Sequence, residues 1–154
     1  MKVSLVLCLP RDAETVRVTR EVLDASLAAL EVARDIRDDI TLALGEACAN
    51  VIQHADPSDE YEVRVQLTNS RCAVEVVDTG RGFDSALLNR VQADQVATAE
   101  HGRGLQIIGA LAENLRIESR PLQGAMIRFD KRLRTEPSLA GPPHADVADS
   151  PSAR

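Results

Sequence analysis

The chain has 154 residues, a formal net charge of −6, two Phe, one Tyr and no Trp. This length suits one domain, whose core must be built from aliphatic side chains. The acidic balance, the lack of a long basic run and the scarcity of aromatic rings to stack on bases argue against direct nucleic-acid binding.

Membrane insertion and disulfide bonds are also disfavoured. No apolar stretch approaches the roughly 20 residues of a membrane-spanning helix, and the short apolar run Val3–Leu9 predicts a strand rather than a leader peptide. The cysteines Cys8, Cys48 and Cys72 are odd in number and lack a CxxC spacing, which indicates reduced thiols in apolar segments. We therefore expect a cytoplasmic protein.

The first third of the chain predicts one strand and two helices. A strand is expected over residues 1–8, and Asp12 can cap a helix that runs to about residue 30. A second helix is expected from residue 34 or 35 to residue 54. Its core-facing side chains share a helical spacing: Ile36, Ile40, Leu44, Ala47 and Val51.

The middle of the chain predicts a hairpin and a long polar segment. Alternating apolar residues indicate two antiparallel strands, at residues 61–67 and 72–77. Residues 78–82 are too rich in glycine for a strand and predict a loop. The polar segment 84–100 contains one expected short helix, near residues 85–91, and a segment of this length in a small domain is usually functional or mobile.

The last elements complete one domain, over residues 1–134. A helix opened by Gly104 precedes two strands, expected at residues 115–119 and 126–132. Residues 135–154 are rich in Pro, Ser and Ala and predict a disordered tail. The order β-α-α-β-β-loop-α-β-β indicates an α+β fold, a two-layer sandwich whose mixed, mostly antiparallel sheet carries helices on one face.

Glu46 and Asn50 form the first candidate pair for chemistry. They are four residues apart on the second helix, so their side chains lie on one face, beside the apolar stripe. Asn offers a neutral oxygen suited to Mg²⁺, and a Glu at the edge of a cleft can act as a general base. The simpler alternative is a solvated polar pair.

The segment Asp78-Thr79-Gly80-Arg81-Gly82-Phe83 follows a hydrophobic strand. Asp78 at a strand end can accept a hydrogen bond from an exocyclic amine such as that of adenine. Gly80 and Gly82 allow the backbone to approach a flat base. An ordinary tight turn would use the same residue types.

The segment Gly102-Arg103-Gly104-Leu105 opens a helix. Backbone N–H groups at a helix N-terminus bind phosphate, and Arg103 could add a charged contact or simply be solvated. The pattern is neither a GxxxxGK[ST] phosphate loop nor a GxGxxG dinucleotide fingerprint.

Taken in order, the segments LALGEACANVIQHA, VVDTGRGFD and HGRGLQIIGALAE resemble the N, G1 and G2 boxes of the GHKL ATPase and kinase superfamily. Within it, the chain is most similar to the small anti-sigma factor serine/threonine-protein kinases of bacteria. The resemblance covers nearly all of residues 1–134 and implies a Bergerat-type sandwich with ATP between helices and sheet. No phosphoacceptor-His helix is expected within these 154 residues, which argues against a complete sensor histidine kinase, and no second domain is expected, which argues against the topoisomerase, chaperone and mismatch-repair branches.

The resemblance also implies roles for individual residues. Asn50 would coordinate Mg²⁺, Glu46 would orient or deprotonate the attacking hydroxyl, and Asp78 would bind the adenine amino group. Residues 84–101 would form the lid over ATP. Two glycine-containing sets would complete the site: Gly80, Gly82 and Phe83 at the base, and Gly102, Arg103, Gly104 and Leu105 at the phosphates. The chain departs from the family at Gly124-Ala125, where a Gly-Thr pair is usual.

The expected function is that of a cytoplasmic, ATP-dependent serine kinase and anti-sigma factor. It would hold a sigma factor and phosphorylate a serine of a small anti-anti-sigma antagonist, and the resemblance is compatible with a homodimer. One alternative is a nucleotide-dependent binding module without catalysis, which Ala125 favours mildly and Glu46 disfavours. Another is a general ATPase without a protein substrate.

Overall fold

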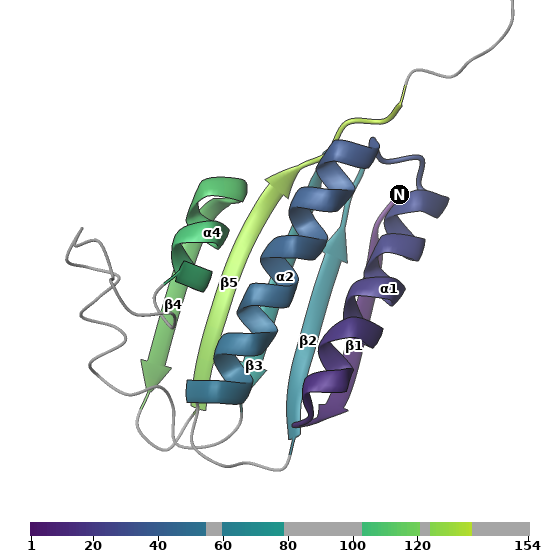
Figure 1. Cartoon of the computed structure of the whole chain (residues 1–154). Helices are drawn as coiled ribbons and strands as arrows, with labels where there is room; N and C mark the ends of the chain where they lie inside the picture. Colours follow the sequence, from purple (N-terminus) through teal and green to yellow (C-terminus); the bar gives the residue numbers. More distant parts are fainter. Residues whose placement is uncertain (55–59, 79–102, 121–123, 137–154) are drawn as a thin grey trace, which may run out of the picture.

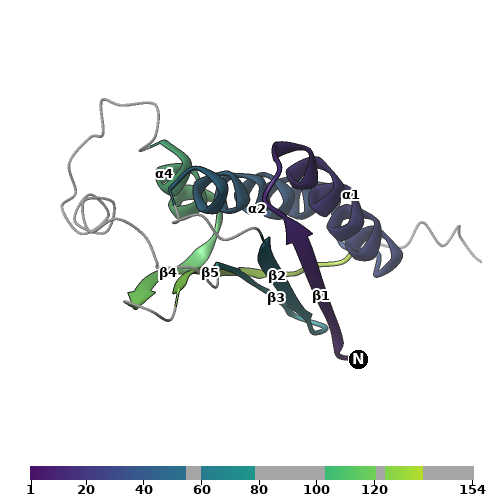
Figure 2. The ribbon, with the colours of Figure 1, turned by 90° about the horizontal axis from the view of Figure 1, so that it is seen from below.

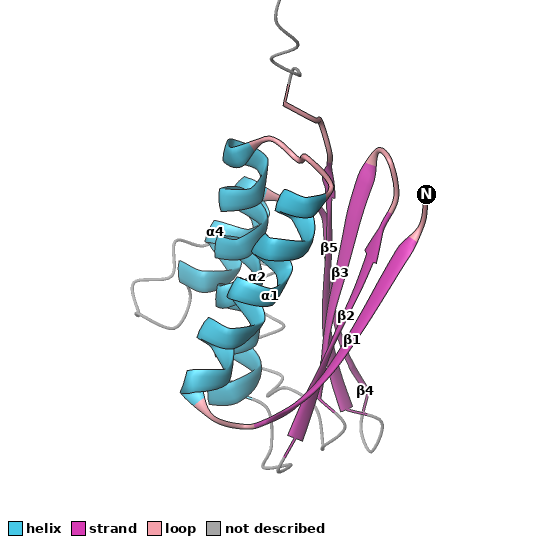
Figure 3. Cartoon of the chain, turned by 90° about the vertical axis from the view of Figure 1, so that its right-hand side faces the viewer, coloured by secondary structure: helices cyan, strands magenta, loops and turns pink. Residues whose placement is uncertain are grey.

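The computed structural model describes residues 1–54, 60–78, 103–120 and 124–136. In this part of the chain, one sheet carries its helices on a single face, as Figures 1 and 3 show. Its elements, in chain order, are β1 (Val3–Pro10), α1 (Ala13–Ala29), α2 (Arg34–His54), β2 (Glu60–Leu67), β3 (Arg71–Asp78), α4 (Arg103–Leu111), β4 (Glu113–Arg120) and β5 (Gly124–Arg132).

This order confirms the expected α+β sandwich. The short helix expected near residues 85–91 and the expected lid lie outside the described residues. The sheet has five strands in the order β1-β2-β3-β5-β4, and every neighbouring pair is antiparallel, so the described sheet is not mixed. None of the described helices is long and apolar enough to cross a membrane.

The expectation that a loop begins at Asp78 is wrong. Asp78 is the last residue of β3 and pairs in register with Tyr61 of β2 and with Ala125 of β5. Asp is a common turn residue, but here strand pairing on both sides outweighs that local preference. Its side chain therefore has a fixed direction, toward the helices.

The ends of α1 set the path of the chain into α2. The carboxylate of Asp12 accepts a hydrogen bond from the Glu14 backbone N–H at 3.0 Å, which caps the helix as expected. At the other end, Glu31 adopts φ = 57°, and the Val32 N–H donates to the carbonyl of Leu27 at 3.1 Å. This left-handed residue ends the helix and turns the chain at once into α2.

The core lies between the helices and the inner face of the sheet (Figure 2). Alternation along β2 buries Tyr61, Val63, Val65 and Leu67 and leaves the intervening side chains on the outer face. Several large apolar side chains are almost fully buried with them: Leu23, Leu27, Ile40, Leu44, Val51, Ile108, Ile127 and Phe129. This aliphatic core fixes α2 and α4 above the sheet.

The chain after β5 holds the start of α2. Thr135 forms an isolated bridge with Val32, and the Ala33 N–H donates to the Arg134 carbonyl at 2.9 Å. The Glu136 carboxylate accepts a hydrogen bond from the Arg34 N–H at 3.1 Å, at the first residue of α2. An acceptor at this position satisfies one of the unpaired N–H groups of a helix N-terminus.

Candidate functional site

Glu46 and Asn50 of α2 face the first turn of α4. A β-carbon placed on Gly104 would lie 2.8 Å from Glu46 Oε2 and 3.1 Å from Asn50 Nδ2. Only a residue without a side chain permits this approach. Two segments that lie far apart in the sequence thus meet at one place, where α2 and α4 pack side by side (Figure 1).

The Asn50 side chain is buried, and its amide nitrogen makes no hydrogen bond to the described residues. The residue is 5% exposed, and its Nδ2 atom has no hydrogen-bond partner among the described residues. A buried amide without a partner costs roughly 1–3 kcal/mol. Rotating the amide by 180° would present its oxygen instead. The group therefore suits a ligand, and its oxygen suits Mg²⁺.

The Glu46 carboxylate lies half-buried beside Asn50, one helical turn earlier. Within the described part of the chain it makes no hydrogen bond or ion pair. A carboxylate without such partners can accept a proton from a bound hydroxyl, provided that the hydroxyl comes within hydrogen-bond reach.

The start of α4 has the polarity that an anion requires. The helix has nine residues, and its first turn carries Arg103 and no acidic side chain. Arg103 is exposed, whereas Gly104 is buried. Leu105 is 6% exposed and belongs to the hydrophobic core, so it can offer a ligand only its backbone N–H. The helix dipole adds partial positive charge at this end.

Asp78 lies on the inner face of β3 and is fully buried. Its strand neighbours Tyr61 and Ala125 are buried as well, at 2% and 1% exposure. Ala125 therefore lies directly beside Asp78 and brings no hydroxyl to it. A carboxylate at this position can accept a hydrogen bond from a donor such as an exocyclic amine.

A polar cluster surrounds Tyr61, the strand neighbour of Asp78. The Tyr61 hydroxyl shares a 2.7 Å hydrogen bond with Thr15 Oγ1 of α1. Burial raises the pKa of Tyr61 to about 12, although the bond with Thr15 lowers it in part. Burial also raises the pKa of Cys48 to about 12, opposed by a hydrogen bond with Tyr61. Both groups are therefore neutral near pH 7.

Arg11 is a residue of this region that the sequence did not reveal. Its guanidinium donates to the carbonyl of Val51, the residue after Asn50, in the last turn of α2. A cation there complements the helix dipole and satisfies an unpaired carbonyl. No local pattern could show this contact, because its partners are 40 positions apart.

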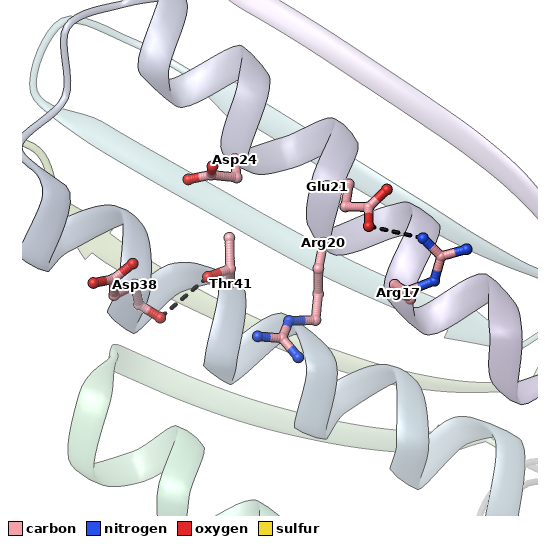
Figure 4. Close-up of a pocket in the computed structure, with 6 residues that line it drawn as sticks. All are labelled: Arg17, Arg20, Glu21, Asp24, Asp38 and Thr41. Atoms are coloured by element: carbon pink, nitrogen blue, oxygen red, sulfur yellow. Dashed lines mark hydrogen bonds and ion pairs between the residues drawn. The ribbon is translucent and has the colours of Figure 1, made fainter.

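The remaining expected site residues, Gly80, Gly82, Phe83 and Gly102, lie outside the described residues. A separate groove runs between α1 and α2 (Figure 4). It is lined by Arg17, Arg20, Glu21, Asp24, Asp38 and Thr41. Arg17 and Glu21 form an ion pair at 2.9 Å there. None of the described candidate site residues lines this groove.

Comparison with known proteins gives a family. The protein-family model described as histidine kinase-like ATPase domain matches residues 9–131 of the chain. The serine-protein kinase RsbW of Bacillus thuringiensis (strain Al Hakam) is 29% identical over 117 residues, which cover 71% of this chain and 73% of that protein. RsbW of Bacillus cereus (strain 03BB102) has the same identity and coverage.

A solved structure shares the fold. The RsbU and RsbW domains of Rv1364c from Mycobacterium tuberculosis align with a TM-score of 0.65 and 21% identity, over 85% of this chain. The match covers 32% of that longer chain. The family match spans α2, with Glu46 and Asn50, and the start of α4, and the chain therefore belongs to the histidine kinase-like ATPase domain family.

Proposed function

We propose that the chain binds Mg·ATP between α2, the C-terminal end of β3 and the first turn of α4, and transfers the γ-phosphoryl group to a protein serine. The observation that carries the proposal is the approach of Gly104 to Glu46 and Asn50. It brings a carboxylate, a buried amide and a helix N-terminus together at one place. Family membership supports ATP as the nucleotide.

Each described residue has a separate task in this proposal. Asp78 accepts a hydrogen bond from the adenine amino group, and the backbone N–H groups at the start of α4 bind phosphate oxygens. Asn50 supplies a neutral oxygen to Mg²⁺. Bound Mg²⁺ would neutralise charge on the phosphates. These contacts position the nucleotide, and positioning supplies most of the catalysis in phosphoryl transfer.

Glu46 is the proposed base. As the serine oxygen forms its bond to the γ-phosphorus, the bond from that phosphorus to the β,γ-bridging oxygen breaks and ADP leaves. The serine proton passes to the Glu46 carboxylate. The lack of any ion pair to Glu46 within the described residues keeps its carboxylate available for this proton.

Similarity to serine-protein kinases named RsbW supports a proposal for the biological role. We propose that the chain holds a sigma factor in the cytoplasm as a homodimer and phosphorylates a small antagonist protein. Phosphorylation of the antagonist would then decide which partner the chain holds.

One observation favours a second candidate, a nucleotide-dependent binding module without catalysis. Ala125, buried beside Asp78, offers no hydroxyl to the base or to an ordered water. Weaker base recognition suits a protein that senses nucleotide rather than one that turns it over. Glu46 favours the kinase, because a binder needs no base.

A transfer assay separates the candidates. The purified chain is incubated with labelled ATP, Mg²⁺ and the small antagonist-domain protein encoded nearest to it. Glu46→Gln should slow transfer roughly 100-fold or more while leaving the Mg·ATP dissociation constant nearly unchanged. Glu21→Gln, on the exposed face of α1, is the matched control. If the wild type binds Mg·ATP but transfers no phosphoryl group, the kinase is excluded and the binding module remains. If the wild type does not bind Mg·ATP, the proposed site is refuted.

A further inference from the structure

Lys131 occupies a core-facing position at the end of β5. The inner face of this strand carries Ala125, Ile127 and Phe129, each at most 1% exposed, and Lys131 is the next residue on that face. Its side chain is 18% exposed. A lysine is rarely buried to this extent unless its ammonium group is paired.

The ammonium group of Lys131 joins two helices. Its Nζ lies 2.8 Å from Asp39 Oδ2 of α2 and also donates to the carbonyl of Leu111. Leu111 is the last residue of α4, so its carbonyl has no partner within the helix. A cation at this end also complements the helix dipole. One side chain thus links β5, α2 and the end of α4.

The contacts of Lys131 add a polar link to the apolar packing between α2 and α4. Asp39 and Glu46 are seven residues apart on α2, and Leu111 and Gly104 are seven apart on α4. Seven residues of helix span about 10 Å. The Lys131 link and the close approach of Gly104 to Glu46 and Asn50 therefore lie at opposite ends of the α2–α4 contact, about the same distance apart on each helix.

We infer that Lys131 is a positioning residue: by holding the end of α4 to Asp39, it keeps the first turn of α4 against Glu46 and Asn50. The inference rests on the proposed function, because that turn is the proposed phosphate-binding element. A nine-residue helix that loses a polar link at one end can tilt on its packed face, and small displacements of binding groups weaken a site strongly. No bond from Lys131 to the nucleotide is required.

The test compares two charged residues of one strand. Lys131→Met keeps the apolar stem and removes both bonds. Arg128→Met is the control, because Arg128 points to the outer face of the sheet and pairs with Glu75 at 2.9 Å, away from α4. Amide hydrogen exchange across residues 103–111 is measured in the nucleotide-free protein, and the Mg·ATP dissociation constant is measured by calorimetry.

Lys131→Met should increase exchange in the first turn of α4 and weaken Mg·ATP binding about tenfold. Lys131→Arg should keep the wild-type hydrogen exchange and Mg·ATP affinity, and Arg128→Met should change neither of them. Unchanged exchange and binding in a folded Lys131→Met protein would overturn the inference. Loss of thermal stability with unaltered binding would reduce Lys131 to a structural residue and overturn it too.

Asp39→Asn is a milder variant, which tests the inference if Lys131→Met does not fold. It removes the ion pair and leaves the bond from Lys131 to Leu111, so a smaller change in the same direction is expected. Equal exchange in this variant and the wild type would then count against the inference. If the wild type does not bind Mg·ATP, the proposed function fails, whereas the exchange comparison still decides whether Lys131 holds α4.

Discussion

Gly104 at the start of α4 lies so close to Glu46 of α2 that a β-carbon on the glycine would be 2.8 Å from Glu46 Oε2. Real β-carbons essentially never approach another atom so closely. The atom in the way is the far end of a flexible side chain, so an added methyl group would displace the carboxylate rather than break the fold.

Gly104→Ala should therefore damage activity more than stability. The methyl group would push aside Glu46 Oε2 and crowd Asn50 Nδ2, and we expect at least a tenfold loss in phosphoryl transfer, since catalytic groups tolerate little misplacement. The thermal midpoint should change little. Transfer rate and thermal midpoint, measured on the same preparation, check this.

Gly109→Ala on the same helix is the matched control. Gly109 is exposed, and a β-carbon there would only reach ordinary contact with Leu115 Cδ2, at 3.9 Å. Because alanine favours helix by about 0.5–1 kcal/mol over glycine, this variant should be more stable and equally active. Equal activity of both variants would contradict the proposed role of Gly104.

Asn50→Ala should separate nucleotide binding from stability. The substitution removes a buried amide whose Nδ2 has no partner among the described residues. The free energy gained by removing this unsatisfied group offsets the cost of the small cavity that the substitution leaves. The nucleotide-free variant should unfold within about 1 kcal/mol of the wild type. Its affinity for Mg·ATP should fall sharply, and the loss should be smaller for ATP without Mg²⁺.

Gln53→Ala, at an exposed position of the same helix, is the control for the Asn50 variant. It should bind Mg·ATP as the wild type does. Chemical unfolding and calorimetric titration of both variants give the comparison. An Asn50→Ala protein with wild-type affinity in Mg²⁺ would exclude Asn50 as the metal ligand.

The elements of the fold were predictable because each carries a local pattern. The apolar spacing predicted where α2 begins and ends. The alternation of apolar and polar residues predicted both ends of β2 and of β3 to within one residue. The placement of Glu46 and Asn50 on one helical face followed from the same periodicity. These signals lie within a few residues of the features that they predict.

The long-range contacts that hold α2 and α4 in place could not be predicted, because their partners are distant in sequence. Lys131 and Asp39 are 92 positions apart, and Glu136 reaches the first residue of α2 across 102 positions. Asp78 shows the converse: its local sequence favours a turn, and pairing with two other strands overrides that preference. The sequence alone does not show which distant residues will contact one another, or which strands will pair.

Ala125→Ser should strengthen nucleotide binding if Asp78 lies at the adenine end. A hydroxyl at position 125 would stand beside the Asp78 carboxylate, because the two residues are strand partners. One added hydrogen bond to the base or to an ordered water contributes about 1 kcal/mol, or a few-fold in affinity. Competition between ATP and GTP checks the result, since the gain should favour ATP. No gain for either nucleotide would mean that position 125 does not face the base.

Stability should fall at alkaline pH because three buried groups hold their protons. Burial raises the pKa of Cys48 and of Cys72 from 9.0 to about 12, and that of Tyr61 from 10.0 to about 12. Between pH 9 and 12 the unfolded chain has lost protons that the folded chain retains. The free energy of unfolding therefore decreases with pH in that window, and these groups contribute no slope below it.

Cysteine variants test the sign of this effect. Cys48→Ala removes one of the three groups, so its free energy of unfolding should decline less steeply between pH 9 and 12. Cys8→Ser should keep the wild-type slope, because Cys8 is exposed. Urea unfolding at fixed pH values from 8 to 12 measures both slopes. A flat profile in the wild type would mean that the thiols and the phenol ionise as readily in the fold as outside it, so that burial does not hold their protons.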